Sequence, residues 1–107
     1  MSSVRITERD TLDVVVVEVH GDLGPAAAQQ LREALVRAIR HSGSARVVLD
    51  LERAHAIAAE GLGAIVAGVD VATDSGVLFH VRGARPTAAE ALRDAGLAPG
   101  RLAPELT

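Results

Sequence analysis

The run Val14-Val15-Val16-Val17 constrains this chain more than any other feature, because it places β-branched apolar residues in direct succession. Such residues favour extended backbone. A strand that is apolar on both faces needs cover on at least one side and is typical of the centre of a sheet. Turn-forming residues follow at Gly21-Asp22-Leu23-Gly24-Pro25, so we predict a strand over residues 11–20. The rest of the chain must supply the layer that covers it.

Helices and further strands alternate along the remaining sequence. Apolar residues at three-four spacing predict helices over residues 26–41 and 61–73, with Pro25 at the start of the first. A third helix is predicted from Thr87, where Thr87 and Glu90 match the capping-box pattern and Gly96 provides a left-handed C-cap. Short β-branched runs predict strands over residues 4–8, 46–51 and 77–81.

The predicted order is therefore β-β-α-β-α-β-α, with a turn around Arg9 and Asp10 joining the first strand pair and a loop through Arg53 and His55. Strands separated by helices imply parallel pairs with right-handed crossovers. We predict an α/β fold, a single mixed β-sheet with α-helices. At 107 residues the chain fits one domain, in which residues 98–107 form an irregular tail or a short final element.

Composition excludes several classes of function. The chain contains no cysteine, so disulfides, thiolate nucleophiles and cysteine-ligated metals are excluded. It has no lysine, a net charge of −3 and Phe79 as its only aromatic residue, so nothing resembles a nucleic-acid surface. No apolar run is long enough to cross a membrane, and the N-terminus has no secretory pattern. We therefore expect a cytoplasmic protein that contacts neither membrane nor nucleic acid.

Catalysis and metal binding find little support in the titratable residues. The histidines, which are His20, His41, His55 and His80, lack metal-ligand spacing on any one helix. His55 lies near Glu60 in the sequence, but no nucleophile accompanies this pair, so we predict no catalytic residue, no metal and no cofactor. Asp50 ends a predicted strand, and we interpret it as structural.

Two segments together carry a resemblance to a known family. Val19-His20-Gly21-Asp22-Leu23-Gly24 ends the valine-rich strand, and Val47-Val48-Leu49-Asp50-Leu51 precedes Ile57-Ala58-Ala59-Glu60-Gly61-Leu62-Gly63. These segments, together with the final Ala91–Leu97, resemble the STAS family, the domain shared by anti-sigma-factor antagonists and sulfate transporters. In that family the strand that corresponds to the valine-rich one usually ends in Gly-Glu-Leu-Asp. The later helix starts with Asp-Ser-Ser/Thr-Gly-Leu-Gly, and a partner kinase phosphorylates the first serine of this motif.

This sequence departs from the family pattern where the phosphate would be added. Ala58 occupies the position of the family's aspartate, Ala59 that of the phosphoacceptor serine, and Glu60 that of the next Ser or Thr. Alanine has no hydroxyl, so the resemblance carries over the fold and the binding surface but not the phosphorylation switch. Glu60 either favours the helix dipole, as acids in a first turn do, or substitutes permanently for the phosphate.

The resemblance implies a protein-binding regulatory module. Its partner would be an anti-sigma factor or a histidine-kinase-like serine kinase. The expected partner-binding residues lie in the first turn region and around the second helix start: Asp22, Leu23, Gly24, His55, Ala58, Ala59, Glu60, Gly61 and Leu62. The alternatives are a domain that senses a small ligand or nucleotide at the free amides of a helix N-terminus, an assembly scaffold, or a homodimer.

Overall fold

The valine-rich segment forms β2 (Val14–Leu23), the central strand of the sheet. The structure, a computed structural model, describes residues 4–11, 13–41, 43 and 45–97. The other elements in chain order are β1 (Arg5–Asp10), α1 (Pro25–His41), β3 (Arg46–Asp50), β4 (Ala54–Ile57), α2 (Ala59–Ser75), β5 (Leu78–Arg82) and α3 (Pro86–Asp94). The predicted α/β class is confirmed. The predicted tail, residues 98–107, lies outside the described part of the chain.

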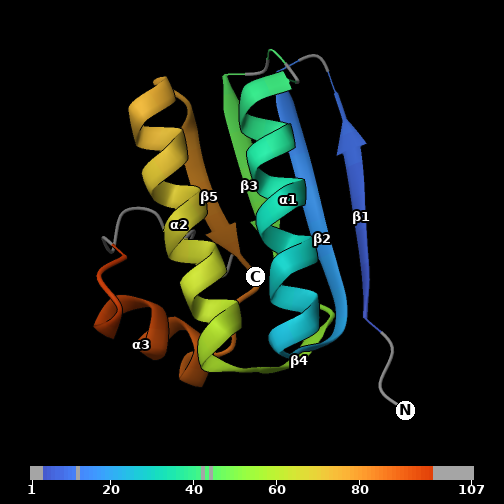
Figure 1. Ribbon diagram of the computed structural model, residues 1–107, viewed down its shortest axis with the longest axis vertical. Helices are drawn as coiled ribbons and strands as arrows, with labels where there is room; N and C mark the ends of the chain where they lie inside the picture. The colour runs from blue at the N-terminus through green and yellow to red at the C-terminus, as the bar shows by residue number, and fades with distance from the viewer. Residues whose placement is uncertain (1–3, 12, 42, 44, 98–107) are drawn as a thin grey trace.

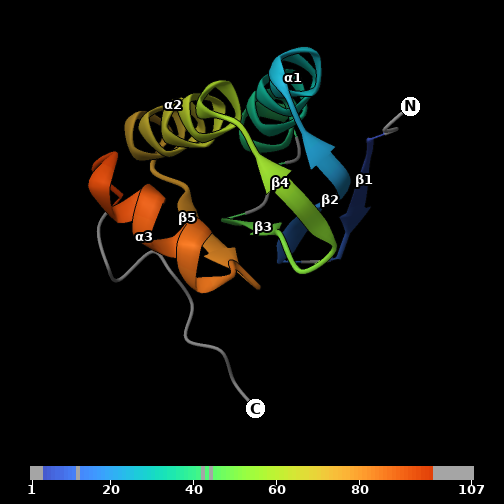
Figure 2. The same cartoon turned by 90° about the horizontal axis from the view of Figure 1, so that it is seen from below.

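The strands form one mixed sheet in the order β1-β2-β3-β5, and β4 pairs with the end of β2. β1 runs antiparallel to β2, whereas the other pairings are parallel. Helices α1 and α2 lie side by side over the same face of the sheet, as Figures 1 and 2 show. α3 lies beside α2 and the β5 edge (Figure 2).

The core lies between this helical layer and one face of the sheet. Alternate residues of β2, among them Val15 and Val17, are fully buried against the helices. Leu31, Leu35 and Ile65 come from the predicted apolar faces of α1 and α2 and are also fully buried. The amphipathic pattern of α1 therefore identified its buried face. The pattern of α2 did so only in part, because Leu62, Val66 and Val69 are half-buried, whereas Gly61, Ala64 and Gly68 are buried.

One strand was missing from the predicted order. The segment predicted as a loop through Arg53 and His55 contains β4, which pairs with the end of β2 through Gly21 and Leu23. Alanine and histidine are weak strand formers, so four residues of this composition carry no local strand pattern. Backbone pairing with a distant segment creates the strand, and it extends β2 beyond the predicted end at His20.

Two local predictions were wrong. Arg9 and Asp10 belong to β1, and the turn lies after them, where the Thr11 amide donates a hydrogen bond to the Val14 carbonyl at 2.9 Å. α3 begins at Pro86 with Arg85 as its N-cap and no side-chain cap, so Thr87 does not form a capping box. Proline is pre-organised for the first helical position, and it starts the helix one residue before the predicted Thr.

A first prediction concerns Gly76 and Gly83, which have nearly equal φ values of 71° and 73°. A Cβ at Gly76 would meet nothing within 4 Å, whereas one at Gly83 would lie 2.8 Å from the Glu52 backbone nitrogen. Left-handed backbone costs an alanine about 1–2 kcal/mol, so Gly76→Ala should lower the free energy of unfolding by roughly that amount. Gly83→Ala should lower it by more, because the loop before β4 must also move.

Urea unfolding of the two variants measures this difference. Equal losses in both would contradict the close approach of Gly83 to Glu52.

Candidate functional site

The two segments of the sequence motif meet at the carboxyl end of β2. The Ala58 amide donates to the Leu23 carbonyl at 3.0 Å. The Ala56 amide donates to Asp22 Oδ1 at 3.2 Å. These bonds hold the end of β4 and the start of α2 against the turn that precedes α1. The predicted binding residues therefore lie on one contiguous region of the structure.

Residues in this region differ in exposure. His55, Ala59 and Glu60 are exposed, whereas Asp22, Gly24, Ala58 and Leu62 are half-buried. Leu23 and Gly61 are buried, and a Cβ on Gly61 would lie 2.8 Å from Leu23 Cδ2. Leu23 and Gly61 thus support the surface from beneath and offer no side chain to a partner. The glycine allows the first turn of α2 to approach β2 closely.

The start of α2 has no side-chain cap. Ala58 is the N-cap, with extended backbone at φ −76° and ψ 165°, and no side chain accepts a hydrogen bond from the first amides. Glu60 lies in the first turn, where its charge favours the helix dipole. The exposed Ala59 beside it carries no hydroxyl. This end of the helix therefore presents free amides, one carboxylate and small apolar side chains.

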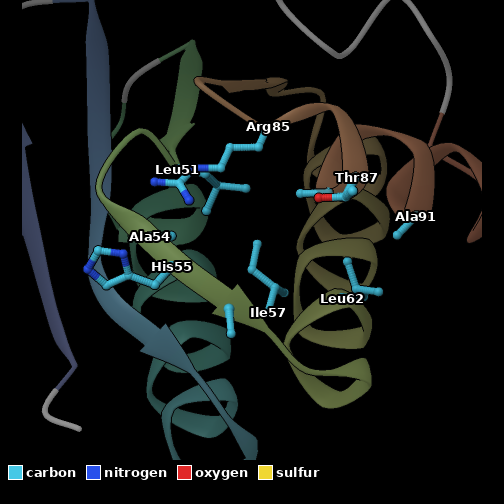
Figure 3. A pocket seen from close by; sticks show the side chains of 10 residues that line it. Leu51, Ala54, His55, Ile57, Leu62, Arg85, Thr87 and Ala91 are labelled. Carbon is cyan, nitrogen blue, oxygen red and sulfur yellow. The ribbon is translucent and has the colours of Figure 1, made fainter.

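A hollow of about 180 Å³ adjoins the start of α2. Figure 3 shows that β4, α2 and the start of α3 surround it, with Arg85 extending toward β4. Its lining is mainly aliphatic: Leu51, Ala54, His55, Ala56, Ile57, Leu62, Arg85, Thr87, Ala88 and Ala91. Such a lining suits an apolar group about the size of one side chain, with a polar rim that binds its flanks.

Sequence reasoning found His55 and Leu62 but missed the α3 side of this hollow. Arg85 and Thr87 are separated from the motif along the chain, and packing of α3 beside α2 brings them to it. The sequence pattern around Thr87 predicted only a helix cap. Nothing in the sequence indicated that Thr87 is exposed and lines the hollow.

Asp50 joins the loop after β3 to the end of β5 at the same end of the sheet. It is 6% exposed, its Oδ1 accepts from the Glu52 amide at 2.9 Å, and its Oδ2 accepts from Arg82 Nε at 3.1 Å. Both oxygens are thus engaged, which supports the structural interpretation of Asp50. Among the described residues no group of His, Asp and Glu is arranged to hold a metal ion.

Comparison with known proteins identifies the family. A family model described as "Mlab, STAS domain" matches residues 6–104. The chain belongs to the STAS domain family. No curated protein sequence matches it. No helix in the described part of this STAS domain is long and apolar enough to cross a membrane.

Solved structures share the fold. An anti-sigma factor antagonist from Mycobacterium paratuberculosis is 24% identical, with a TM-score of 0.81 over 97% of this chain and 88% of that chain. Moorella thermoacetica RsbS with a serine-to-glutamate substitution is 20% identical, with a TM-score of 0.79 over 95% and 88%. The Bacillus cell fate determinant SpoIIAA in its phosphorylated form is 19% identical, with a TM-score of 0.77 over 92% and 89%.

A second prediction concerns the uncapped helix. Ala58→Asp places a carboxylate at the N-cap of α2, where it can accept a hydrogen bond from a first-turn amide. The free energy of unfolding should rise by about 0.5–2 kcal/mol, the usual difference between alanine and a capping residue. Thermal and urea unfolding measure the change. Ala45→Asp, at an exposed site outside any helix, is the matched control, and an equal gain there would contradict the capping explanation.

Proposed function

We propose that this STAS domain is a non-catalytic protein-binding module of the anti-sigma-factor-antagonist type, with no serine phosphorylation switch. Its partner is an anti-sigma factor or a histidine-kinase-like serine kinase. The observation that carries the proposal is the exposed, hydroxyl-free start of α2 beside an apolar hollow. The binding surface comprises this helix start, the turn at Asp22 and Gly24, and β4 with His55.

The size and lining of the hollow favour a protein partner. Interfaces concentrate their binding energy in a few anchor side chains that fill well-packed pockets. A volume of about 180 Å³ accommodates an anchor of this kind. Pockets for drug-sized ligands have roughly 300–1,000 Å³, so the volume does not favour the alternative of a nucleotide sensor.

The absence of a hydroxyl makes the binding constitutive. No serine or threonine occurs between residues 45 and 72, which include β4 and most of α2. A phosphate cannot be added at Ala59, and Glu60 keeps one negative charge beside it at all times. A carboxylate carries less charge than a phosphate, so we assign Glu60 to the helix dipole and not to permanent exclusion of the partner.

The arrangement of polar groups supports a binding role over catalysis. His55 is exposed on β4 and Asp50 is engaged by Arg82. Within the described part of the chain no hydrogen bond joins either of them to the Thr87 hydroxyl that lines the hollow. A catalytic site needs a nucleophile or base held in a convergent polar pocket. The lining here is mainly aliphatic, and His55, Arg85 and Thr87 are its polar side chains.

A third prediction tests the identity and control of the partner. The tagged chain and the variant Ala58→Asp/Ala59→Ser/Glu60→Ser are used as baits in lysate of the source cell, with ATP, and retained proteins are identified by mass spectrometry. The parent should retain a kinase-like anti-sigma factor with or without ATP. The restored variant should release it when ATP allows phosphorylation. Retention by the restored variant alone would show that the parent has lost this partner.

A fourth prediction tests the place of binding. Ala56 is exposed and lines the hollow, so Ala56→Arg should fill it and weaken binding of the identified partner by about tenfold or more, as loss of an anchor contact does. Ala45→Arg adds the same side chain just before β3, whereas the hollow lies beyond the other end of that strand. This control should leave the affinity unchanged. Calorimetric titration of both variants measures this, and equal affinities would place the interface elsewhere.

A further inference from the structure

The sheet has a second face that no helix of the described residues covers. Strand pairing aligns its residues in rows, such as Val14, Arg46 and Leu78, or Val16, Val48 and His80. Their neighbours in each strand, including Val15 and Val47, point to the helical side because side chains alternate along a strand. Figure 2 shows α1 and α2 on that helical side only.

Aliphatic side chains lie at the centre of this second face, outside the core. Val14, Val48 and Leu78 lie outside the buried cluster between sheet and helices, whereas Val16 between them is itself buried, with 9% of its surface exposed. Leu78 is 54% exposed, and Val14 and Val48 are half-buried. An apolar centre on an otherwise polar surface is the usual anatomy of an interface.

Arginines surround this apolar centre. Arg82 pairs with Asp50 at 3.1 Å and Arg9 with Glu18 at 3.5 Å, which satisfies the acids of the face. Arg5 and Arg46 are exposed, and their side chains have no partner among the residues that the structure describes. The face is therefore positive, although the chain as a whole has a net charge of −3.

We propose that this face binds an amphipathic helix with acidic flanks, supplied by a partner protein. β2, β3 and β5 form the parallel part of this mixed sheet, and sheets that are parallel throughout are almost always covered by helices on both faces. The apolar stripe of such a helix packs on the central valines, and its carboxylates pair with Arg5 and Arg46. This surface is separate from the start of α2 and does not depend on the function proposed there.

The same chemistry disfavours two other occupants. A second copy placed on the face by a two-fold axis would bring two surfaces of the same positive charge together. Nucleic acid would gain no stacking, because Phe79 is the only aromatic residue and is fully buried. An acidic helix satisfies both the apolar centre and the positive rim.

The probe is a synthetic helical peptide with a leucine stripe flanked by glutamates. A length of about 18 residues gives a helix of roughly 27 Å, matching the 27 Å extent of the molecule. A peptide with lysine in place of each glutamate is the charge control. Titrated into the isotope-labelled full chain, the acidic peptide should shift the amide signals of β2, β3 and β5, and the basic peptide should not.

Arg5→Gln/Arg46→Gln should weaken acidic-peptide binding by about fivefold or more, since it removes two rim charge pairs. Arg32→Gln/Arg37→Gln removes the same charge from exposed positions of α1 and should have no effect. Circular dichroism confirms that both variants fold. Equal weakening by both pairs, shifts confined to α1 or α2, tighter binding of a DNA duplex, or self-association lost in Arg5→Gln/Arg46→Gln would each overturn the proposal.

Discussion

The structure depends on the pairing of β2 with its neighbours, because this strand contacts more of the fold than any other. β1, β3 and β4 all form hydrogen bonds to it, and its buried valines face α1. Full burial of one aliphatic side chain contributes roughly 1.5–3 kcal/mol, so Val15, Val17 and Val19 together supply an amount comparable to the net stability of a small domain. A polar residue at any of these positions would remove the apolar contacts by which the helices pack on the sheet.

The end of β2 connects this core to the proposed binding surface. Leu23 is the last residue of the strand, it is fully buried, and it lies under Gly61 at the first turn of α2. Its carbonyl accepts the Ala58 amide, and Asp22 beside it accepts the Ala56 amide. Helix start and strand end therefore form one rigid unit, and the surface above them is pre-organised. Pre-organisation lowers the entropy that a partner must lose on binding.

Elements with a strong periodic pattern in the sequence were predictable. Features created by packing between distant segments were not. The valine run identified the central strand, and the apolar stripe of α1 identified its buried face. The stripe of α2 was only partly right, because close approach to Leu23 and Leu35 buries Gly61 and Gly68. β4 escaped because Ala54–Ile57 becomes a strand only through its pairing with β2. The motif named residues that meet at the end of β2, but the hollow had no signal, because Arg85 and Thr87 reach it through the packing of α3. The open sheet face also had no signal, since alternation cannot distinguish a covered side from an uncovered one when both contain valine.

The absence of a phosphoacceptor changes how such a module can be controlled. In the function proposed above, Ala59 offers no covalent switch, so occupancy of the α2 surface would follow from the concentrations and affinities of the binding partners. The second surface proposed on the open sheet face would allow the domain to bind another partner at the same time. Coupling between two sites requires a structural element that has two arrangements and is biased by both ligands. The element that connects the two proposed surfaces is β2, and hydrogen-bonded strands hold it in one arrangement on both sides. Two partners on so rigid a strand would bind independently, so the domain would act as an adaptor that holds them together.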